Sequence, residues 1–224
     1  MREVSIAVVQ TQPALAEVEH NLVHMSDLIQ KICLEEPVDL IIFPELATSG
    51  YECGMRFAEL AERVPGHSVN LLARRANEFD VHILFGLPTK VKVESILYNG
   101  AVLIGPEGEA ALEYRKVHLK GEEKLAFRPG FRYIVFDAGF GTLGVLIGWD
   151  LAFPEAARSL VLDGAELICV CANWEKPRQD EWYTFLKARA LENAAFVAAS
   201  NRIGEEYSYR FFGHSAVVSP YGEV

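Results

Sequence analysis

The sequence contains a junction at which a strand, a sharp turn and a helix follow one another closely. The apolar residues 144–147 lead into Gly148, Trp149 and Asp150, and a helix is expected to begin at Pro154. Enzymes often place a nucleophile at such a junction, because the turn exposes a side chain beside free backbone N–H groups. Gly148 occupies that position and supplies no side chain, so the junction as it stands has no nucleophile.

Two charged residues have the types that nucleophilic cleavage of an amide or a nitrile requires. Glu45 follows the predicted buried strand 39–43, so we expect its carboxylate to point into a cavity at a strand end as a general base. Lys116 ends a hairpin strand whose alternation turns it inward, and an inward lysine is rare unless it is paired. Glu45 is the expected partner. The alternatives are a helix-capping or surface carboxylate at Glu45 and a solvated hairpin end at Lys116.

Three segments together resemble the nitrilase or carbon–nitrogen hydrolase superfamily. They cover residues 41–51, 114–119 and 144–155. The resemblance extends over essentially the whole chain and implies a Glu-Lys-Cys triad, of which Glu45 and Lys116 are two members. The third position departs from the family pattern, because Gly148 stands where the family has cysteine.

The resemblance also assigns residues around the triad. A second family glutamate precedes a Phe-x-Pro-Gly turn; Glu123 has the better spacing for it, and the adjacent Glu122 is the alternative. This glutamate would position substrate or assist proton transfer, unless both residues belong to a solvated acidic loop. The backbone N–H of Trp149 would help to bind the oxyanion. The residues expected to border the substrate site are Tyr51, Trp149, Asn173 and Trp174.

Several polar residues are expected to support this site without reacting. His118 is interpreted as a hydrogen-bond donor, because the triad needs no imidazole. Arg189 and Glu192 are expected to form an ion pair. The residues expected to brace the turn by hydrogen bonds are Asp150, Glu155 and Arg158.

The function implied is hydrolysis of a non-peptide C–N bond through a cysteine acyl-enzyme. The pattern Trp-Asp-x-x-Phe-Pro-Glu after position 148 resembles amide and carbamoyl hydrolases more than true nitrilases, so a small amide is the favoured substrate, with nitrilase and N-carbamoyl hydrolase as alternatives. Because Gly148 supplies no sulfur, this chain is expected to be inactive. A natural non-catalytic relative that binds an amide or acyl ligand, or acts as an interaction protein, is the alternative from another class. The triad chemistry requires no cofactor and no metal.

Alternating strand and helix patterns supply the elements that position these residues. Expected strands cover residues 4–10, 39–43, 82–87, 98–104, 110–114, 133–136, 143–147, 167–172, 196–201 and 215–218, and expected helices cover residues 17–35, 69–79, 154–162 and 180–193, with Ser68 as the cap of the second helix. The mixture of hairpins and crossovers does not fit a pure doubly wound sheet. The family resemblance implies a four-layer α-β-β-α sandwich of the nitrilase type, with two sheets packed face to face.

Composition and charge restrict the possible partners. The 224 residues, half of them apolar, are ample for one domain that spans residues 1–224. A net charge of −10 argues against a nucleic-acid or anionic membrane partner. No apolar run is long enough to span a bilayer and the first residues do not resemble a signal peptide, so a cytoplasmic location is expected. The four cysteines, which form no metal motif, are Cys33, Cys53, Cys169 and Cys171.

The ends and outer helices lead to two further expectations. Residues 219–223 form a predicted turn before Val224, so the chain is expected to be truncated within a hairpin. The resemblance implies a homodimer formed through the helices at 154–162 and 180–193. Trp182 and Phe185 are candidate interface anchors, and the alternative is that both pack onto their own sheet.

Overall fold

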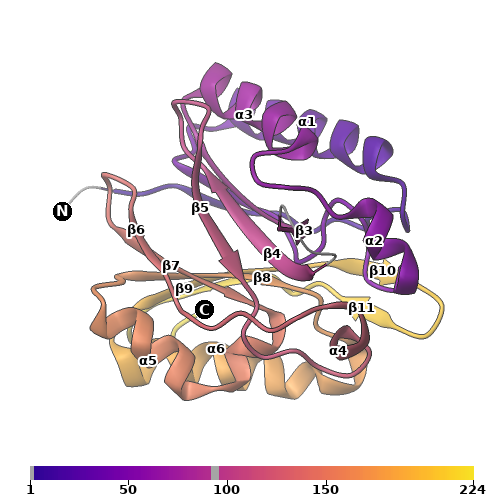
Figure 1. The fold of residues 1–224 in the computed structure, drawn as a ribbon. Coiled ribbons are helices and arrows are strands. Elements are labelled where there is room, and N and C mark those ends of the chain that lie inside the picture. Colours follow the sequence, from indigo (N-terminus) through magenta and orange to yellow (C-terminus); the bar gives the residue numbers. More distant parts are fainter. Residues whose placement is uncertain (1–2, 92–95) are drawn as a thin grey trace.

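The computed structural model describes residues 3–91 and 96–224, and within them two sheets lie face to face between two layers of helices (Figure 1). This is the four-layer α-β-β-α arrangement that the sequence predicted. The first sheet has the order β1 (Ile6–Val8), β2 (Leu40–Ile42), β3 (His82–Lys90), β4 (Leu97–Ile104) and β5 (Ala110–Arg115). The second has the order β12 (Ala216–Val218), β9 (Phe196–Asn201), β8 (Leu167–Ala172), β7 (Thr142–Ile147) and β6 (Val135–Asp137).

Long helices cover the outer face of each sheet (Figure 1). The first sheet carries α1 (Val18–Glu35) and α3 (His67–Phe79), and the second carries α5 (Pro154–Leu162) and α6 (Gln179–Asn193). Shorter pieces are α2 (Phe57–Leu60), α4 (Glu123–Ala126) and the hairpin of β10 (Ile203–Glu205) and β11 (Arg210–Phe212). Among the residues that the structure describes, no helix combines the length and the apolar character needed to cross a bilayer.

The central strands are apolar on both faces because each sheet is covered on both sides. All residues of β2 and β8 are buried, as expected for strands that lie between a helix layer and a second sheet. Cys169 and Cys171 lie in the core between the two sheets. Cys53 is also buried, and burial raises the pKa of its thiol to about 11.

The element boundaries differ from the sequence prediction at a few places. The first strand is shorter than predicted, and β3 continues to Lys90. The predicted role of Ser68 as a helix cap was wrong, because α3 begins at His67 and Ser68 lies inside it, bonded to Glu62. The hairpin of β10 and β11 and the short helices α2 and α4 were not predicted, since their few residues leave no periodic pattern.

The strand directions bring distant residues to one end of the sandwich. The strands β1, β2 and β3 are parallel, as are β7, β8 and β9. Glu45 follows β2, Gly148 follows β7 and Asn173 follows β8. Polar residues at such strand ends form the usual ligand sites of open α/β sheets.

Candidate active site

Glu45 is buried beneath three hydrogen-bond donors. Its Oε1 accepts from Lys116 Nζ at 2.6 Å and from Asn99 Nδ2 at 2.7 Å, and its Oε2 accepts from the backbone N–H of Asn173 at 3.0 Å. Burial raises the pKa of Glu45, although the Lys116 ammonium opposes this effect. A carboxylate with a raised pKa accepts a proton more readily than an exposed one, which suits a general base.

Lys116 is held between two carboxylates. Its Nζ lies 2.6 Å from Glu45 Oε1 and 2.8 Å from Glu123 Oε1, and its side chain is 1% exposed. Burial alone would lower the pKa of Lys116, but the two carboxylates outweigh it and raise the pKa. Lys116 is therefore an ammonium ion, and the solvated hairpin end considered from the sequence is excluded.

Gly148 faces this pair. It begins the 3₁₀ turn Gly148–Ala152 directly after β7, with φ at +43°. A Cβ built on Gly148 would overlap Glu45 Oε2 and lie 3.1 Å from Lys116 Nζ. A side chain at position 148 would thus point at both charged residues. Trp149 follows in the first turn, where N–H groups lack intrahelical partners.

Glu123, and not the exposed Glu122, lies beside Lys116. Glu123 Oε1 also accepts a hydrogen bond of 2.8 Å from the Tyr51 hydroxyl, and Oε2 accepts from the backbone N–H of Lys120 at 3.3 Å. Burial and the nearby carboxylates raise the pKa of Tyr51, so its hydroxyl stays protonated as a donor. The structure therefore brings Glu45, Lys116, Glu123 and Tyr51 into one connected cluster.

Asp150 braces the turn after Gly148, as predicted. Oδ2 of its buried carboxylate accepts from the Tyr114 hydroxyl at 2.7 Å and from the backbone N–H of Ile147 at 3.2 Å. Oδ1 accepts from the backbone N–H of His118 at 2.8 Å and lies 3.0 Å from the Nδ1 of that histidine. The His118 ring also stacks on Phe153, with centroids 3.6 Å apart. Asp150 thus joins the turn to the segment that follows Lys116.

Arg189 is a second brace, which the sequence prediction missed. Its guanidinium donates 3.0 Å hydrogen bonds to both carbonyl groups of residues 151–152. The predicted ion pair of Arg189 with Glu192 is confirmed at 3.0 Å. The predicted bracing by Glu155 and Arg158 was wrong, because Glu155 is exposed and Arg158 donates to the carbonyl of Glu192 on α6.

Asn173, Trp149 and Trp174, which were expected to border the substrate site, differ in their burial and contacts. The carboxamide of Asn173 is buried, and neither its nitrogen nor its oxygen has a hydrogen-bond partner among the described residues. Trp149 is half-buried, with its ring centroid 5.3 Å from that of Trp174. Trp174 and Trp182, the second of which belongs to α6, are buried and pack against each other. The prediction of Trp182 as an interface anchor was therefore wrong, since its own chain already covers it.

The sequence of the chain matches a family model described as carbon-nitrogen hydrolase over residues 5–224. The chain belongs to the carbon–nitrogen hydrolase family. It is 43% identical over 223 residues to a probable nitrilase of Schizosaccharomyces pombe, covering 98% of this chain and 82% of the relative. It is 35% identical over 188 residues to 2-oxoglutaramate amidase of Bacillus subtilis, covering 83% of this chain and 72% of the relative.

A solved structure extends the family likeness to three dimensions. A glutamate-to-glutamine mutant of the amidase from Nesterenkonia sp. AN1, which shows covalent addition of the acetamide moiety of fluoroacetamide at the active site cysteine, superposes with a TM-score of 0.90. Its sequence is 29% identical, and the match covers 98% of this chain and 84% of that chain. The nitrilase-type sandwich predicted from the sequence is therefore confirmed for this family member.

Asn99 is a site residue that sequence reasoning missed. It lies on β4 inside an otherwise apolar run, is fully buried, and donates to Glu45. A buried asparagine costs free energy unless it is hydrogen-bonded, so a lone asparagine in an apolar strand was the signal available in the sequence.

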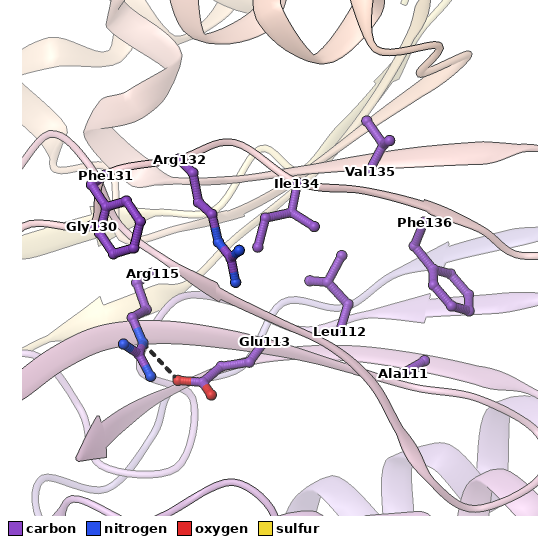
Figure 2. A pocket seen from close by; sticks show the side chains of 10 residues that line it. All are labelled: Ala111, Leu112, Glu113, Arg115, Gly130, Phe131, Arg132, Ile134, Val135 and Phe136. Atoms are coloured by element: carbon purple, nitrogen blue, oxygen red, sulfur yellow. Dashed lines mark hydrogen bonds and ion pairs between the residues drawn. The ribbon is translucent and has the colours of Figure 1, made fainter. Parts of the chain in front are cut away.

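Another hollow lies away from this cluster, between the edge strands β5 and β6 (Figure 2). It has a volume of about 340 Å³ and a largely apolar lining that includes Leu112, Ile134 and Phe136. Its charged residues include Glu113 and Arg115, which pair with each other at 2.9 Å (Figure 2). None of its lining residues belongs to the cluster around Lys116, so this hollow is not the reaction centre.

Proposed function

We propose that this family member is an amidase-type hydrolase scaffold whose reaction centre consists of Glu45, Lys116 and the side chain at position 148. We further propose that Gly148 leaves this chain without a nucleophile. The observation that carries this proposal is the direction of position 148, where a Cβ would meet both the carboxylate and the ammonium. A thiol there would have a base and a cation beside it, as cleavage of an amide requires.

With a thiol at position 148, a few groups carry out all steps of the proposed reaction. Glu45 takes the thiol proton, and the thiolate attacks the carbonyl carbon of a small amide. The Lys116 ammonium and the backbone N–H of Trp149 stabilise the oxyanion. Glu45 then gives its proton to the leaving amine as the C–N bond breaks, which leaves a thioester. Water, activated by Glu45, hydrolyses the thioester and restores the thiol.

Three further residues complete the proposed site. Glu123 binds the Lys116 ammonium together with Glu45, and Tyr51 donates to Glu123. Asn173 offers a buried carboxamide without a partner among the described residues, so both its donor and its acceptor are available to a substrate amide. An amide is supported over a nitrile because a nitrile has no N–H to donate to the Asn173 oxygen.

Burial raises the pKa of all four native thiols, Cys33 included, so they are poor substitutes for the absent thiol. Cys169 lies buried between the sheets, and burial raises its pKa to about 12. Cys171 is likewise buried with a raised pKa. The Cys53 thiol donates to the Ser49 carbonyl at 3.1 Å. A thiol with a raised pKa forms little of the reactive thiolate near neutral pH.

The alternative is a natural non-catalytic relative that binds an amide or acyl ligand. Gly148 itself is the observation that favours it. Against it stands the buried cluster of Glu45, Lys116 and Glu123, which costs free energy to desolvate and serves the chemistry of a nucleophile. Homodimer assembly and a cytoplasmic location stay predictions from the sequence.

Restoring the thiol tests the proposal. Gly148→Cys should release ammonia from small aliphatic amides faster than the parent chain, with slower release from nitriles and carbamoyl compounds of matched size. A variant that binds these amides but releases no ammonia would contradict the proposed hydrolase and favour the non-catalytic alternative.

A further inference from the structure

The turn at Gly50 binds the carboxylate of a residue from the distant β10–β11 hairpin. Gly50 has φ at +81°, so two successive N–H groups after it can face one anion. Glu206 accepts from the backbone N–H of Tyr51 at 3.0 Å and from that of Glu52 at 2.6 Å. A Cβ on Gly50 would lie 2.9 Å from Glu206 Oε1, so glycine leaves the space that this approach needs.

Glu206 is itself held in a fixed position. Its side chain is 3% exposed and forms an ion pair with Arg202, whose side chain is fully buried. The Arg202 guanidinium lies over the Phe211 ring, 4.3 Å from its centroid. A buried carboxylate with a charged partner and two N–H donors is well satisfied, and its loss would leave those donors unpaired.

The same hairpin also contacts the ring of Tyr51. The ring of Tyr209 meets it edge-on at 5.2 Å, and the ring of Phe211 does so at 6.1 Å. The Tyr51 hydroxyl then donates to Glu123 Oε1 at 2.8 Å, and that oxygen lies 2.8 Å from Lys116 Nζ. Backbone and ring of Tyr51 are therefore both fixed by the hairpin, and its hydroxyl ends at the reaction centre.

We propose that Glu206 is a positioning residue for the reaction centre. By binding the N–H groups after Gly50, Glu206 fixes the position of the Tyr51 hydroxyl. That hydroxyl in turn keeps Glu123 in contact with Lys116. Misplacement of such a group by about 1 Å can lower a rate about a hundredfold. The inference rests on the proposed function for its effect on turnover, but the link from Glu206 to Tyr51 is independent of turnover.

Tyrosine NMR tests that link in the parent chain. In protein labelled with [¹³Cζ]tyrosine, the signal of Tyr51 is identified by its absence from Tyr51→Phe. Glu206→Gln should shift or broaden this signal, because an amide cannot hold the two N–H groups and Arg202 as a carboxylate does. Glu205→Gln is the matched control, since Glu205 is 61% exposed and pairs only with Arg210 among the described residues. An unchanged Tyr51 signal in Glu206→Gln overturns the inference.

If Glu206→Gln does not fold, Glu206→Asp keeps the test open. This variant retains the charge but withdraws the carboxylate by one methylene, so the Tyr51 signal should still move. An aspartate variant with the parent signal overturns the inference.

Kinetics in the Gly148→Cys background supply the second readout. Glu206→Gln and Tyr51→Phe should each lower kcat about tenfold, Glu206→Asp should recover part of the loss, and the double variant should be no slower than the slower single variant. Additive losses, or no loss in Glu206→Gln, overturn the inference. If Gly148→Cys shows no turnover, the proposed function fails, and the tyrosine signal alone decides the role of Glu206.

Discussion

The carboxylate of Glu45 occupies the space that a side chain on Gly148 would fill. Its Oε2 stays there through a hydrogen bond from the backbone N–H of Asn173, while Oε1 contacts Lys116. Any residue larger than glycine at position 148 must displace this oxygen. The base and the nucleophile position are thus in direct contact, which leads to predictions about stability as well as reactivity.

Gly148→Ala should lower the free energy of unfolding for two reasons. The positive φ strains any L side chain by about 1–3 kcal/mol, and the new methyl group must push Glu45 away from its partners. Gly54→Ala is the matched control, because Gly54 has φ at +52° and open space where a Cβ would lie. Urea unfolding should therefore show a larger loss for Gly148→Ala than for Gly54→Ala.

The excess loss should depend on Glu45. In a double-mutant cycle, Glu45→Ala and Gly148→Ala should be non-additive, because Glu45→Ala removes the side chain that the new methyl group must displace. Equal losses for Gly148→Ala and Gly54→Ala, together with additivity in the cycle, would show that Glu45 does not occupy this space.

Glu45 should give the stability of the protein a characteristic pH dependence. Its pKa in the folded protein is raised above the ordinary 4.5, chiefly by burial. The folded state therefore binds this proton more tightly than the unfolded chain does. The resulting stabilisation is fully present below about pH 4.5 and is lost as the pH rises through the folded-state pKa. The difference in unfolding free energy between the parent and Glu45→Gln should thus shrink as the pH rises.

Urea unfolding between about pH 4.5 and pH 8 measures this difference. Glu205→Gln, at an exposed glutamate, serves as the control substitution. A parent whose advantage over Glu45→Gln grows with pH would indicate a lowered pKa for Glu45, contrary to this prediction.

The outer layer of α5 and α6 is predicted to form a homodimer, although not through Trp182. Leu162 on α5 is 77% exposed and Leu191 on α6 is 55% exposed, and apolar side chains of this kind favour an interface. Leu162→Glu should shift the mass measured by light scattering towards the monomer. Leu34→Glu, on the opposite helix layer, should leave it unchanged. A monomeric parent at high micromolar concentration would contradict the dimer.

Local pattern located most strands and helices and the residues at strand ends, whereas the four-layer arrangement was implied by the family resemblance. Glu45 and Lys116 could be found because each lies at the end of a predicted strand, where a charged side chain is rarely buried unless it has a partner. The partner of Tyr51 could not be found in this way, since Glu206 lies 155 residues further along the chain. Trp182 was misjudged because one helix pattern fits both an interface and a packed face.

The most direct test of the reaction centre is the intact mass of Gly148→Cys after incubation with a small amide or with fluoroacetamide. We expect an acyl or acetamide adduct on the introduced thiol at neutral pH. We expect no adduct on the parent chain, and a strongly reduced acyl adduct with the small amide when Glu45→Gln or Lys116→Met is added to Gly148→Cys. An adduct on the parent chain, or an acyl adduct on Gly148→Cys that forms equally fast without Glu45 and Lys116, would contradict the proposed reaction centre.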